Sequence, residues 1–423
     1  MTRRRSTMRR PLRVGLYGLL GAGNIGNDAS MEAVLRYLRA DHPDAIVDAM
    51  CPGWERLKSE YGIEASPLWR RSYEQASGVA AIALKMFGKG VEGFGIASWV
   101  RRHDVVIVPG MGVLEATLPL RPWETPYAMF MLGVSGRLFR TKVALVSVGA
   151  NAINQRLTRW MLNSAARLAH YRSYRDTGTR EAMRQRGLDV TQDHVYPDLV
   201  FGLPMPPHDS GDPQIVGVGV MAYYGGNDDR ASAADINASY VRNLKIFIRW
   251  LVDGGRSVRL LVGDGSDDSV VQEILDDLRT HRPDLDPGRV VAEPVFSFAD
   301  LARAMAPVGT VVATRYHNVM CALKLSKPTI SIGYAAKNRA LMGDMGLSEF
   351  CQDVKSLDVD LLIKQFTELQ ERSAQLKPQI AECCSAQAAL LGQQFTKLSA
   401  VLFPRAEATP STPVDAQLAG GNR

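Results

Sequence analysis

TRYHNVMCALKLSKPTISIGYAAKNR, residues 314–339, is the stretch that decides how this chain is interpreted. The apolar run VGTVVA before it is typical of a buried strand. A short helix, NVMCALKL, and a second strand, PTISIGY, follow. Arg315 and His317 therefore fall at a strand-to-helix turn, and Lys337 lies just beyond the next strand. In an open α/β sheet, residues at the carboxyl ends of strands line the ligand crevice.

These three side chains favour acid chemistry on a small phosphorylated or carboxylated substrate. Arginine and lysine bind anions, and histidine donates or accepts a proton near neutral pH. Taken singly, each has a structural alternative: Arg315 as an ion-pair partner, His317 as a packed or capping residue, Lys337 as a solvated side chain. Their positions after two successive strands, near glycine-rich loops, indicate a site instead.

Strands alternate with helices through both halves of the 423-residue chain, which is long enough for two domains. The segment GLPMPPHDSGDPQ, residues 202–214, is the best linker because it is rich in Pro, Gly and Asp. We therefore expect an α/β protein with two doubly wound, Rossmann-like domains facing a cleft. The expected divisions are a basic disordered leader (1–12), the first domain (13–203), the second, donor-binding domain (214–350), helices that pack back across both domains (351–403) and a disordered tail (404–423).

Some local predictions are more specific. Helical structure is expected from the second strand to about residue 102, and the C-terminal helices are expected to break at Pro378. The apolar stretches 80–99 and 126–139 are interpreted as helices packed in the core, with contact to a bilayer surface as the alternative. No apolar run reaches the roughly 18–20 residues of a spanning helix.

Composition and charge favour a soluble globular protein in a reducing cytoplasm. Hydrophobic residues make up 46% and charged residues 22%, and the five cysteines show no CxxC spacing. Six arginines before residue 14 equal the whole net charge of +6. That leader could contact anionic lipid or nucleic acid, although no nucleic-acid-binding module, P-loop or zinc spacing is present. A location at the inner face of a membrane is compatible with these features.

Further loops follow the predicted strands. GLLGAGNIGNDAS, residues 18–30, is a glycine-rich turn that presents Asn24 and Asn27, with Asp28 as a candidate helix cap. A second glycine-rich turn, PGMGVL, begins at residue 109. Arg175 ends a short strand at residues 171–174. Its alternative role is as a local partner of Asp176, which, like Thr177, can cap the next helix.

Together these loops resemble the polysaccharide pyruvyl transferase family over most of residues 13–350. GLYGLLGAGNIGNDA is similar to the family's Gly-Asn-x-Gly-Asp turn, with Asn27 inserted, and PGMGVL to its Gly-Gly-Gly-x-Leu turn, with methionine at the middle glycine. SYRDTGTREAMRQRGLD resembles its Arg-Asp-x-x-Ser motif and YPDLVF its Asp-Pro-Ala-Phe element. The strongest match is RYHNVMCALKLSKPTISIGYAAKNR, which resembles Arg-x-His, a Lys-Pro strand and a second lysine.

The resemblance implies a fold like that of nucleotide-sugar glycosyltransferases, the GT-B architecture. It also implies transfer of pyruvate from phosphoenolpyruvate to two hydroxyls of a sugar in a cell-surface polysaccharide or glycolipid precursor, with release of phosphate. Arg175, Arg315 and Lys337 would hold the donor, Asn24 would contact it, and His317 would be the general acid. Phosphoenolpyruvate is then a substrate, and no cofactor or metal is expected.

Several points stay open at the sequence level. The base for the sugar hydroxyls could be Glu115, Asp176 or Asp228, and Trp123, Tyr223 and Tyr224 are candidate platforms for the acceptor, which could be lipid-linked. The sequence does not indicate the acceptor sugar or the oligomeric state. A GT-B glycosyltransferase using a nucleotide sugar is the alternative enzyme, and a sugar- or nucleotide-binding accessory protein of the same fold is the non-catalytic alternative.

Overall fold

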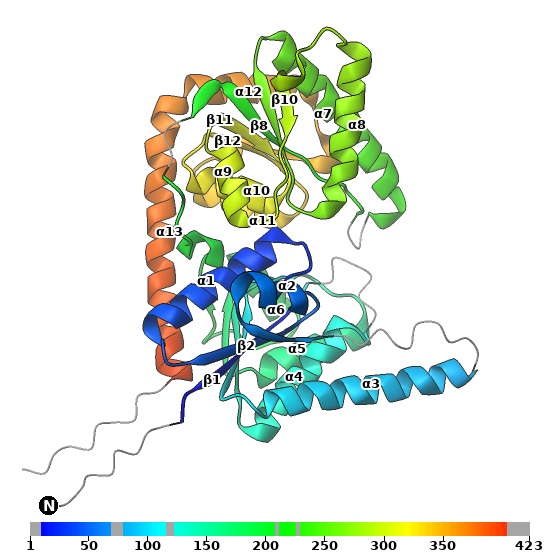
Figure 1. Cartoon of the computed structure of the whole chain (residues 1–423), viewed down its shortest axis with the longest axis vertical. Coiled ribbons are helices and arrows are strands. Elements are labelled where there is room, and N and C mark those ends of the chain that lie inside the picture. Colours follow the sequence, from blue (N-terminus) through cyan, green and yellow to red (C-terminus); the bar gives the residue numbers. More distant parts are fainter. Residues whose placement is uncertain (1–9, 69–78, 116–121, 208–210, 226–228, 404–423) are drawn as a thin grey trace, which may run out of the picture.

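Two parallel β-sheets, each flanked by helices, form the frame of the molecule (Figure 1). The computed structural model describes residues 10–403 except 69–78, 116–121, 208–210 and 226–228. The first sheet has seven strands in the order β3-β2-β1-β4-β5-β6-β7, and the second has six in the order β10-β9-β8-β11-β12-β13. This arrangement confirms the predicted fold class of two Rossmann-like domains.

The first sheet and its helices are built from the N-terminal half of the chain. Its strands are β1 (Arg13–Tyr17), β2 (Ile46–Cys51), β3 (Glu64–Pro67), β4 (Val105–Pro109), β5 (Lys142–Val148), β6 (Tyr171–Tyr174) and β7 (His194–Val195). Its helices are α1 (Ile25–Asp41), α2 (Trp54–Tyr61), α3 (Val79–Val100), α4 (Thr125–Phe139), α5 (Arg156–Leu168) and α6 (Thr177–Gln185).

The second sheet follows the same plan. Its strands are β8 (Asp212–Gly219), β9 (Ser257–Leu261), β10 (Val290–Ala292), β11 (Val308–Ala313), β12 (Thr329–Gly333) and β13 (Cys351–Asp353). Its helices are α7 (Ala233–Asp253), α8 (Asp268–His281), α9 (Phe298–Met305), α10 (Tyr316–Lys324) and α11 (Ala336–Asp344), and the chain continues into α12 (Val359–Glu371) and α13 (Ser373–Leu402).

The strand order fixes where a ligand can sit. In the first sheet the chain runs outward from β1 to β3 and then returns to place β4 beside β1. In the second it runs from β8 to β10 and returns to place β11 beside β8. Each return is a topological switch point, where the loops diverge and leave a crevice at the strand carboxyl ends. β4 and β11 are buried along their whole length, which explains their unbroken apolar sequences.

Three local predictions were wrong. The region predicted as continuously helical contains β3, because Glu64–Pro67 pairs in parallel with β2. α1 begins at Ile25, so Asn24 is its N-cap and Asp28 lies buried in the first turn. The C-terminal helices separate at Arg372 and not at Pro378, which lies inside α13. The helix continues there because Leu376 and Ile380 on either side are buried.

The apolar helix α3 is only partly packed, contrary to the prediction for residues 80–99. Ile96 and Trp99 near its C-terminal end are buried, whereas Met86, Phe87 and Phe94 are mostly exposed. α3 projects away from the rest of the first domain at the lower right of Figure 1. Within the described part of the chain, no helix is both long and apolar enough to span a bilayer.

Helix α13 packs against both domains, as predicted for a C-terminal helix that packs back (Figure 1). Gln394, fully buried, accepts a hydrogen bond from Ser147 Oγ at 3.0 Å and donates one to Ser173 Oγ at 2.8 Å. In the N-terminal half of the helix, Cys384 Sγ contacts the carbonyl oxygen of Leu323 at 3.3 Å. One continuous helix therefore joins the first sheet to α10 of the second domain.

Candidate active site

A cavity of about 210 Å³ lies between the two domains, at the carboxyl ends of their strands. All five residues predicted from the sequence line it: Asn24, Arg175, Arg315, His317 and Lys337. Asn24 and Arg175 come from the first domain and the other three from the second. The cavity is therefore formed only when the two domains face each other.

Asn24 reaches the cavity from the N-terminus of α1. Its side-chain oxygen accepts a hydrogen bond from the backbone N–H of Asn27 at 3.1 Å, which caps the helix. The side-chain amide of Asn27 in turn donates to the carbonyl of Leu19 at 3.1 Å. Because the oxygen of Asn24 is used in the cap, its amide group is the part available to a ligand. The glycine-rich turn thus also brings the positive end of a helix dipole to the cavity.

Arg175, at the end of β6, is held by Glu115. The guanidinium Nη2 and a carboxylate oxygen of Glu115 form a close ion pair, and Arg175 Nε lies 3.8 Å from Asp176. The guanidinium also lies over the ring of Tyr316, 5.6 Å from its centroid. Burial alone would raise the pKa of Glu115, but the charges of Lys337 and Arg175 lower it overall. Glu115 is therefore ionised at neutral pH.

Arg315 is anchored by a buried carboxylate. Its Nε and Nη2 donate to the two oxygens of Asp267 at 3.0 and 2.5 Å, and Asp267 is fully buried. Asp267 also accepts a backbone hydrogen bond from Ala222 at 3.0 Å. This bidentate pair fixes the plane of the guanidinium while Arg315 still lines the cavity.

Lys337, in the first turn of α11, lies against two aromatic rings. Its Nζ lies 5.5 Å from the ring centroid of Tyr316 and 5.2 Å from that of Tyr334. Among the described residues its ammonium group makes no hydrogen bond and no ion pair within 4 Å, in contrast to the two arginines. Lys337 is thus the cation of the cavity that is best placed to accept an anionic ligand.

His317 crosses the domain boundary and packs on the backbone of α1. A Cβ built on Gly26 would lie 1.8 Å from Cε1 of His317, so the ring rests where any other residue would place its side chain. The His317 side chain keeps 19% of its surface exposed and borders the cavity. It is therefore accessible to a ligand and is not sealed inside one domain.

The electrostatic environment of His317 opposes protonation of its imidazole. Burial, followed by the positive charges of Lys337, Arg175 and Arg315, lowers the pKa of His317 to about 3. Its imidazole is therefore neutral at pH 7. A general acid at this position needs the surrounding positive charge to be offset, and a bound anion would do so.

Sequence reasoning missed several residues that build this site. Asp198 is buried beside His317, and burial raises the pKa of its carboxyl although the charge of Arg175 opposes this. Asp198 stands in YPDLVF and Tyr316 between the two predicted site residues, so both lay inside quoted motifs. Asp267 lies in the sequence GDGSDD, outside the motifs on which the site prediction rests. Its pairing with Arg315 spans 48 positions of sequence and leaves no local pattern.

Of the described residues predicted as bases or as platforms for the acceptor, most do not line the cavity. Glu115 lines the cavity, whereas Asp176 caps α6 by accepting a 2.6 Å hydrogen bond from the N–H of Thr179, and Asp228 lies outside the described residues. Tyr223 is buried and donates to Asp229 at 2.5 Å, so its face is not free for a sugar. Trp123 and Tyr224 are exposed but do not line the cavity.

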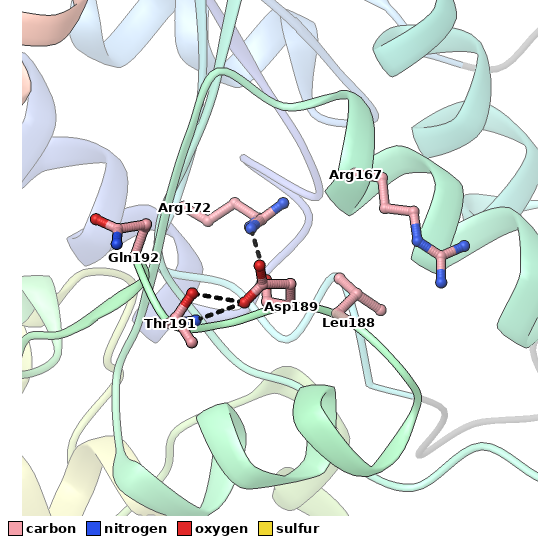
Figure 2. Close-up of a pocket in the computed structure, with 6 residues that line it drawn as sticks. All are labelled: Arg167, Arg172, Leu188, Asp189, Thr191 and Gln192. Atoms are coloured by element: carbon pink, nitrogen blue, oxygen red, sulfur yellow. Dashed lines mark hydrogen bonds between the residues drawn. The ribbon is translucent and has the colours of Figure 1, made fainter.

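A larger hollow of about 330 Å³ lies elsewhere in the first domain (Figure 2). Arg172 donates to the backbone carbonyl of Asp189 at 3.1 Å, and the Asp189 carboxylate accepts from the N–H and hydroxyl of Thr191 at 3.0 and 2.6 Å. Arg172 also pairs with Asp193 at 2.9 Å. These polar groups satisfy one another, and none of the predicted site residues lies there. Across the described ranges, no group of three or more His, Cys, Asp or Glu side chains is arranged to hold a metal ion.

Solved structures with the same architecture are two-domain proteins of the GT-B-like class. A protein from Listeria monocytogenes, assigned as a UDP-N-acetylglucosamine 2-epimerase, shares 11% identity over 92% of this chain and 96% of its own, with a TM-score of 0.59. The Neisseria meningitidis UDP-GlcNAc 2-epimerase bound to UDP-GlcNAc shares 11% identity over 90% and 100%, with a TM-score of 0.55. The Methanocaldococcus jannaschii UDP-GlcNAc 2-epimerase shares 10% over 85% and 92%, with a TM-score of 0.55. At these identities the similarity defines the fold.

The sequence gives a narrower assignment than the fold. The model of the polysaccharide pyruvyl transferase family matches residues 24–335, from the N-cap of α1 to the residue before α11. The chain belongs to this family, as its motifs predicted. A search of curated proteins returned no match.

Proposed function

We propose that this protein is a ketal pyruvyl transferase that moves pyruvate from phosphoenolpyruvate onto two hydroxyls of a sugar in a cell-surface polysaccharide or glycolipid precursor, and releases phosphate. The observation that carries the proposal is the cavity between the domains, where Arg175, Arg315 and Lys337 surround the imidazole of His317. Three cations around one proton-transfer group suit a small donor that carries both a phosphate and a carboxylate.

The two kinds of cation have different roles in this proposal. Arg315 is fixed by Asp267, so it offers a rigid face with its remaining N–H groups. Arg175 is paired with Glu115, and donor binding can replace that carboxylate with one from the substrate. Lys337 has no anionic partner within 4 Å among the described residues and takes the donor directly. The amide of Asn24 and the N-terminal end of α1 add neutral donors opposite the cations.

The chemistry needs one proton donated and two accepted. His317 gives a proton to the methylene carbon of the enol phosphate, which leaves the neighbouring carbon electron-deficient. One sugar hydroxyl forms a C–O bond there and loses its proton. The second hydroxyl forms another C–O bond and loses its proton while the bond to phosphate breaks. The products are a cyclic ketal and phosphate, and one hydroxyl proton restores His317. These reaction steps require no cofactor. A positioned general acid accelerates such a proton transfer by about 10²–10⁴-fold.

Glu115 is the better placed of the two candidate bases that the structure describes, because it lines the cavity and Asp176 does not. The charges of Lys337 and Arg175 lower the pKa of Glu115, which makes it a weak base. Once the donor's own charges are paired with these cations, Glu115 becomes more basic and can take a hydroxyl proton. Donor binding would thus raise the pKa of the acid, His317, and that of the base, Glu115, in the same step.

A nucleotide-sugar glycosyltransferase is the second candidate, because the GT-B-like fold occurs in a UDP-GlcNAc-bound enzyme. Titration calorimetry of the full chain separates the two. We expect phosphoenolpyruvate to bind and UDP-GlcNAc not to compete with it. Binding of UDP-GlcNAc without any heat from phosphoenolpyruvate would support the glycosyltransferase.

Catalysis is tested by phosphate release in the presence of phosphoenolpyruvate and saccharide fractions. We expect release to depend on both substrates and to disappear in His317→Ala. If His317→Ala behaves like the parent chain in every assay while the donor still binds, the protein is a binding accessory of the same fold.

A further inference from the structure

The outer surface of α3 exposes more apolar area than a solvated helix should. Met86, Phe87 and Phe94 have exposed fractions of 72%, 65% and 76%. Phe87 and Phe94 are seven residues apart, so they lie on one face of the helix, two turns from each other. Isolated exposed apolar residues are common, but a row of them on a projecting helix marks an interaction surface.

The helices next to α3 extend this apolar surface. The hydroxyl of Tyr127 in α4 donates to the carbonyl of Lys89 in α3 at 2.9 Å, which joins the two helices. Phe130 in α4 packs against Trp160 in α5 with ring centroids 5.0 Å apart. Trp160 and Trp123 remain more than half exposed. Tryptophan and phenylalanine side by side on a surface are typical of groups that enter the headgroup region of a bilayer.

The charges of the same helices are one-sided. α4 and α5 contain no acidic residue, and they carry Arg137, Arg156, Arg159 and Arg167. In α3, Glu92 forms a 2.5 Å ion pair with Lys89 and is neutralised. A second copy of this basic surface would be repelled by the first, whereas an anionic lipid surface complements it.

The position of this surface relates it to the cavity. α4 and α5 follow β4 and β5, whose carboxyl ends lie at the cavity, so the N-terminal ends of both helices begin at that same edge. Trp123 precedes α4 by two residues, and Arg156 and Trp160 lie in the first two turns of α5. Trp123, Arg156 and Trp160 therefore lie toward the cleft side of the first domain, whereas Arg137 and Arg167 lie at the opposite ends of the two helices.

We propose that the outer surface of α3, α4 and α5 docks the protein on an anionic phospholipid bilayer, with the aromatic side chains in the headgroup layer and the arginines against lipid phosphates. Docking itself is independent of the reaction. Its purpose, which rests on the proposed function, is to present the cavity to a lipid-linked saccharide at the membrane surface.

The proposal is tested by co-sedimentation of the full chain with vesicles of phosphatidylcholine alone or mixed with phosphatidylglycerol. We expect binding only to the mixed vesicles, with an affinity that falls as salt rises. The double variant Phe87→Ser and Phe94→Ser should bind the mixed vesicles at least about tenfold more weakly than the parent chain, because it loses two groups that enter the bilayer. Arg156→Gln should weaken binding and reduce its salt dependence.

The matched control is Phe296→Ser, which removes a phenylalanine exposed to 69% in the second domain and should bind vesicles like the parent chain. Donor binding to the parent, the double variant and the control should be the same, which separates docking from the proposed function. The proposal is wrong if the parent chain does not co-sediment with anionic vesicles, or if the double variant co-sediments with them as strongly as the parent chain. A parent dimer that the double variant converts to a monomer, measured by light scattering, would instead make this surface a self-association interface.

Discussion

The Nε2 atom of His317 lies 4.0 Å from Oδ2 of Asp198, and neither atom has a hydrogen-bonding partner among the described residues. The two groups belong to different domains and are brought together by the cleft. The separation is beyond a hydrogen bond, so a closure of about 1 Å would join them. The structure thus holds an imidazole and a carboxylate just beyond hydrogen-bonding distance. In the proposed function, donor binding would complete this pair.

Removing the charge of Asp198 should therefore slow the reaction without preventing donor binding. Asp198→Asn keeps the oxygen that accepts from the Val200 N–H at 3.1 Å. We expect kcat to fall by about 10²-fold and the pH optimum to shift downward, because the imidazole loses the carboxylate that favours its charged form. Asp193→Asn is the control, since Asp193 is also buried but pairs with Arg172. An unchanged pH profile in Asp198→Asn would remove the pair from the mechanism.

Donor binding should be accompanied by proton uptake. The pKa of His317 is about 3, lowered by burial and by Lys337, Arg175 and Arg315. Bound phosphate and carboxylate offset these charges and raise that pKa, so a proton is taken up when the bound value approaches the working pH. Since the bound form then carries more protons, affinity rises as pH falls through the bound pKa. Calorimetry in buffers of different ionisation enthalpy measures the uptake, and His317→Gln should abolish it. Equal uptake in His317→Gln would assign the proton elsewhere.

A methyl group at Gly26 should displace the imidazole. The new Cβ would lie 1.8 Å from the ring, and the ring must move because the α1 backbone is fixed. We expect Gly26→Ala to lose about 10²-fold in activity through misplacement of the acid, with little change in melting temperature. Gly392→Ala is the control, because Gly392 is also helical and has nothing within 4 Å of its Cβ position. Full activity in Gly26→Ala would show that the position of His317 is not critical.

Lys337 should contribute directly to donor affinity. Lys337→Gln removes a cation that has no anionic partner within 4 Å among the described residues, and we expect donor Kd to rise by about 10- to 100-fold, the usual effect of losing a charge-assisted contact. Arg339→Gln, two residues along the same helix, removes an exposed charge that lies 3.9 Å from Asp353 and should leave Kd unchanged. Equal effects of the two variants would reduce the role of Lys337 to long-range attraction.

Arg315 should be structural as well as functional. Arg315→Ala leaves the fully buried Asp267 without its cation, so the free energy of unfolding should fall by about 3–5 kcal/mol. Arg315→Lys keeps the charge and should lose much less stability while still weakening the donor, because the planar guanidinium is gone. Urea unfolding and donor titration on both variants separate the two roles. If Arg315→Ala is as stable as the parent chain, Asp267 does not depend on this pair.

The regular elements could be predicted because their signals are local. The run VGTVVA corresponds residue for residue to β11, and Thr125–Phe139, with Pro126 in its first turn, corresponds to α4. β3 was missed because its four residues, EASP, are short and carry no alternating apolar pattern. The start of α1 was missed because Gly26 was interpreted as part of a turn. Gly26 instead lies in the helix, where its lack of a side chain leaves room for the His317 ring.

The site was predictable where one motif carried its residues and not where distant loops meet. Arg315, His317 and Lys337 share one stretch of sequence. The partners Asp267 and Asp198 come from other loops, and neither their burial nor the depressed pKa of His317 is encoded locally. The prediction that α3 packs in the core failed because apolar composition does not distinguish burial in protein from exposure at another apolar or amphiphilic surface.

The long helix α13 restricts how substrates can enter. It runs along the left edge of Figure 1, tied to the first sheet through Gln394 and to the second domain through Cys384, whereas α3 projects on the opposite side. Because α13 contacts both domains along one edge, we expect any opening of the cleft to be widest at the opposite edge. In the proposed function, we therefore expect a saccharide acceptor to enter from the opposite edge, on the side toward which α3 projects.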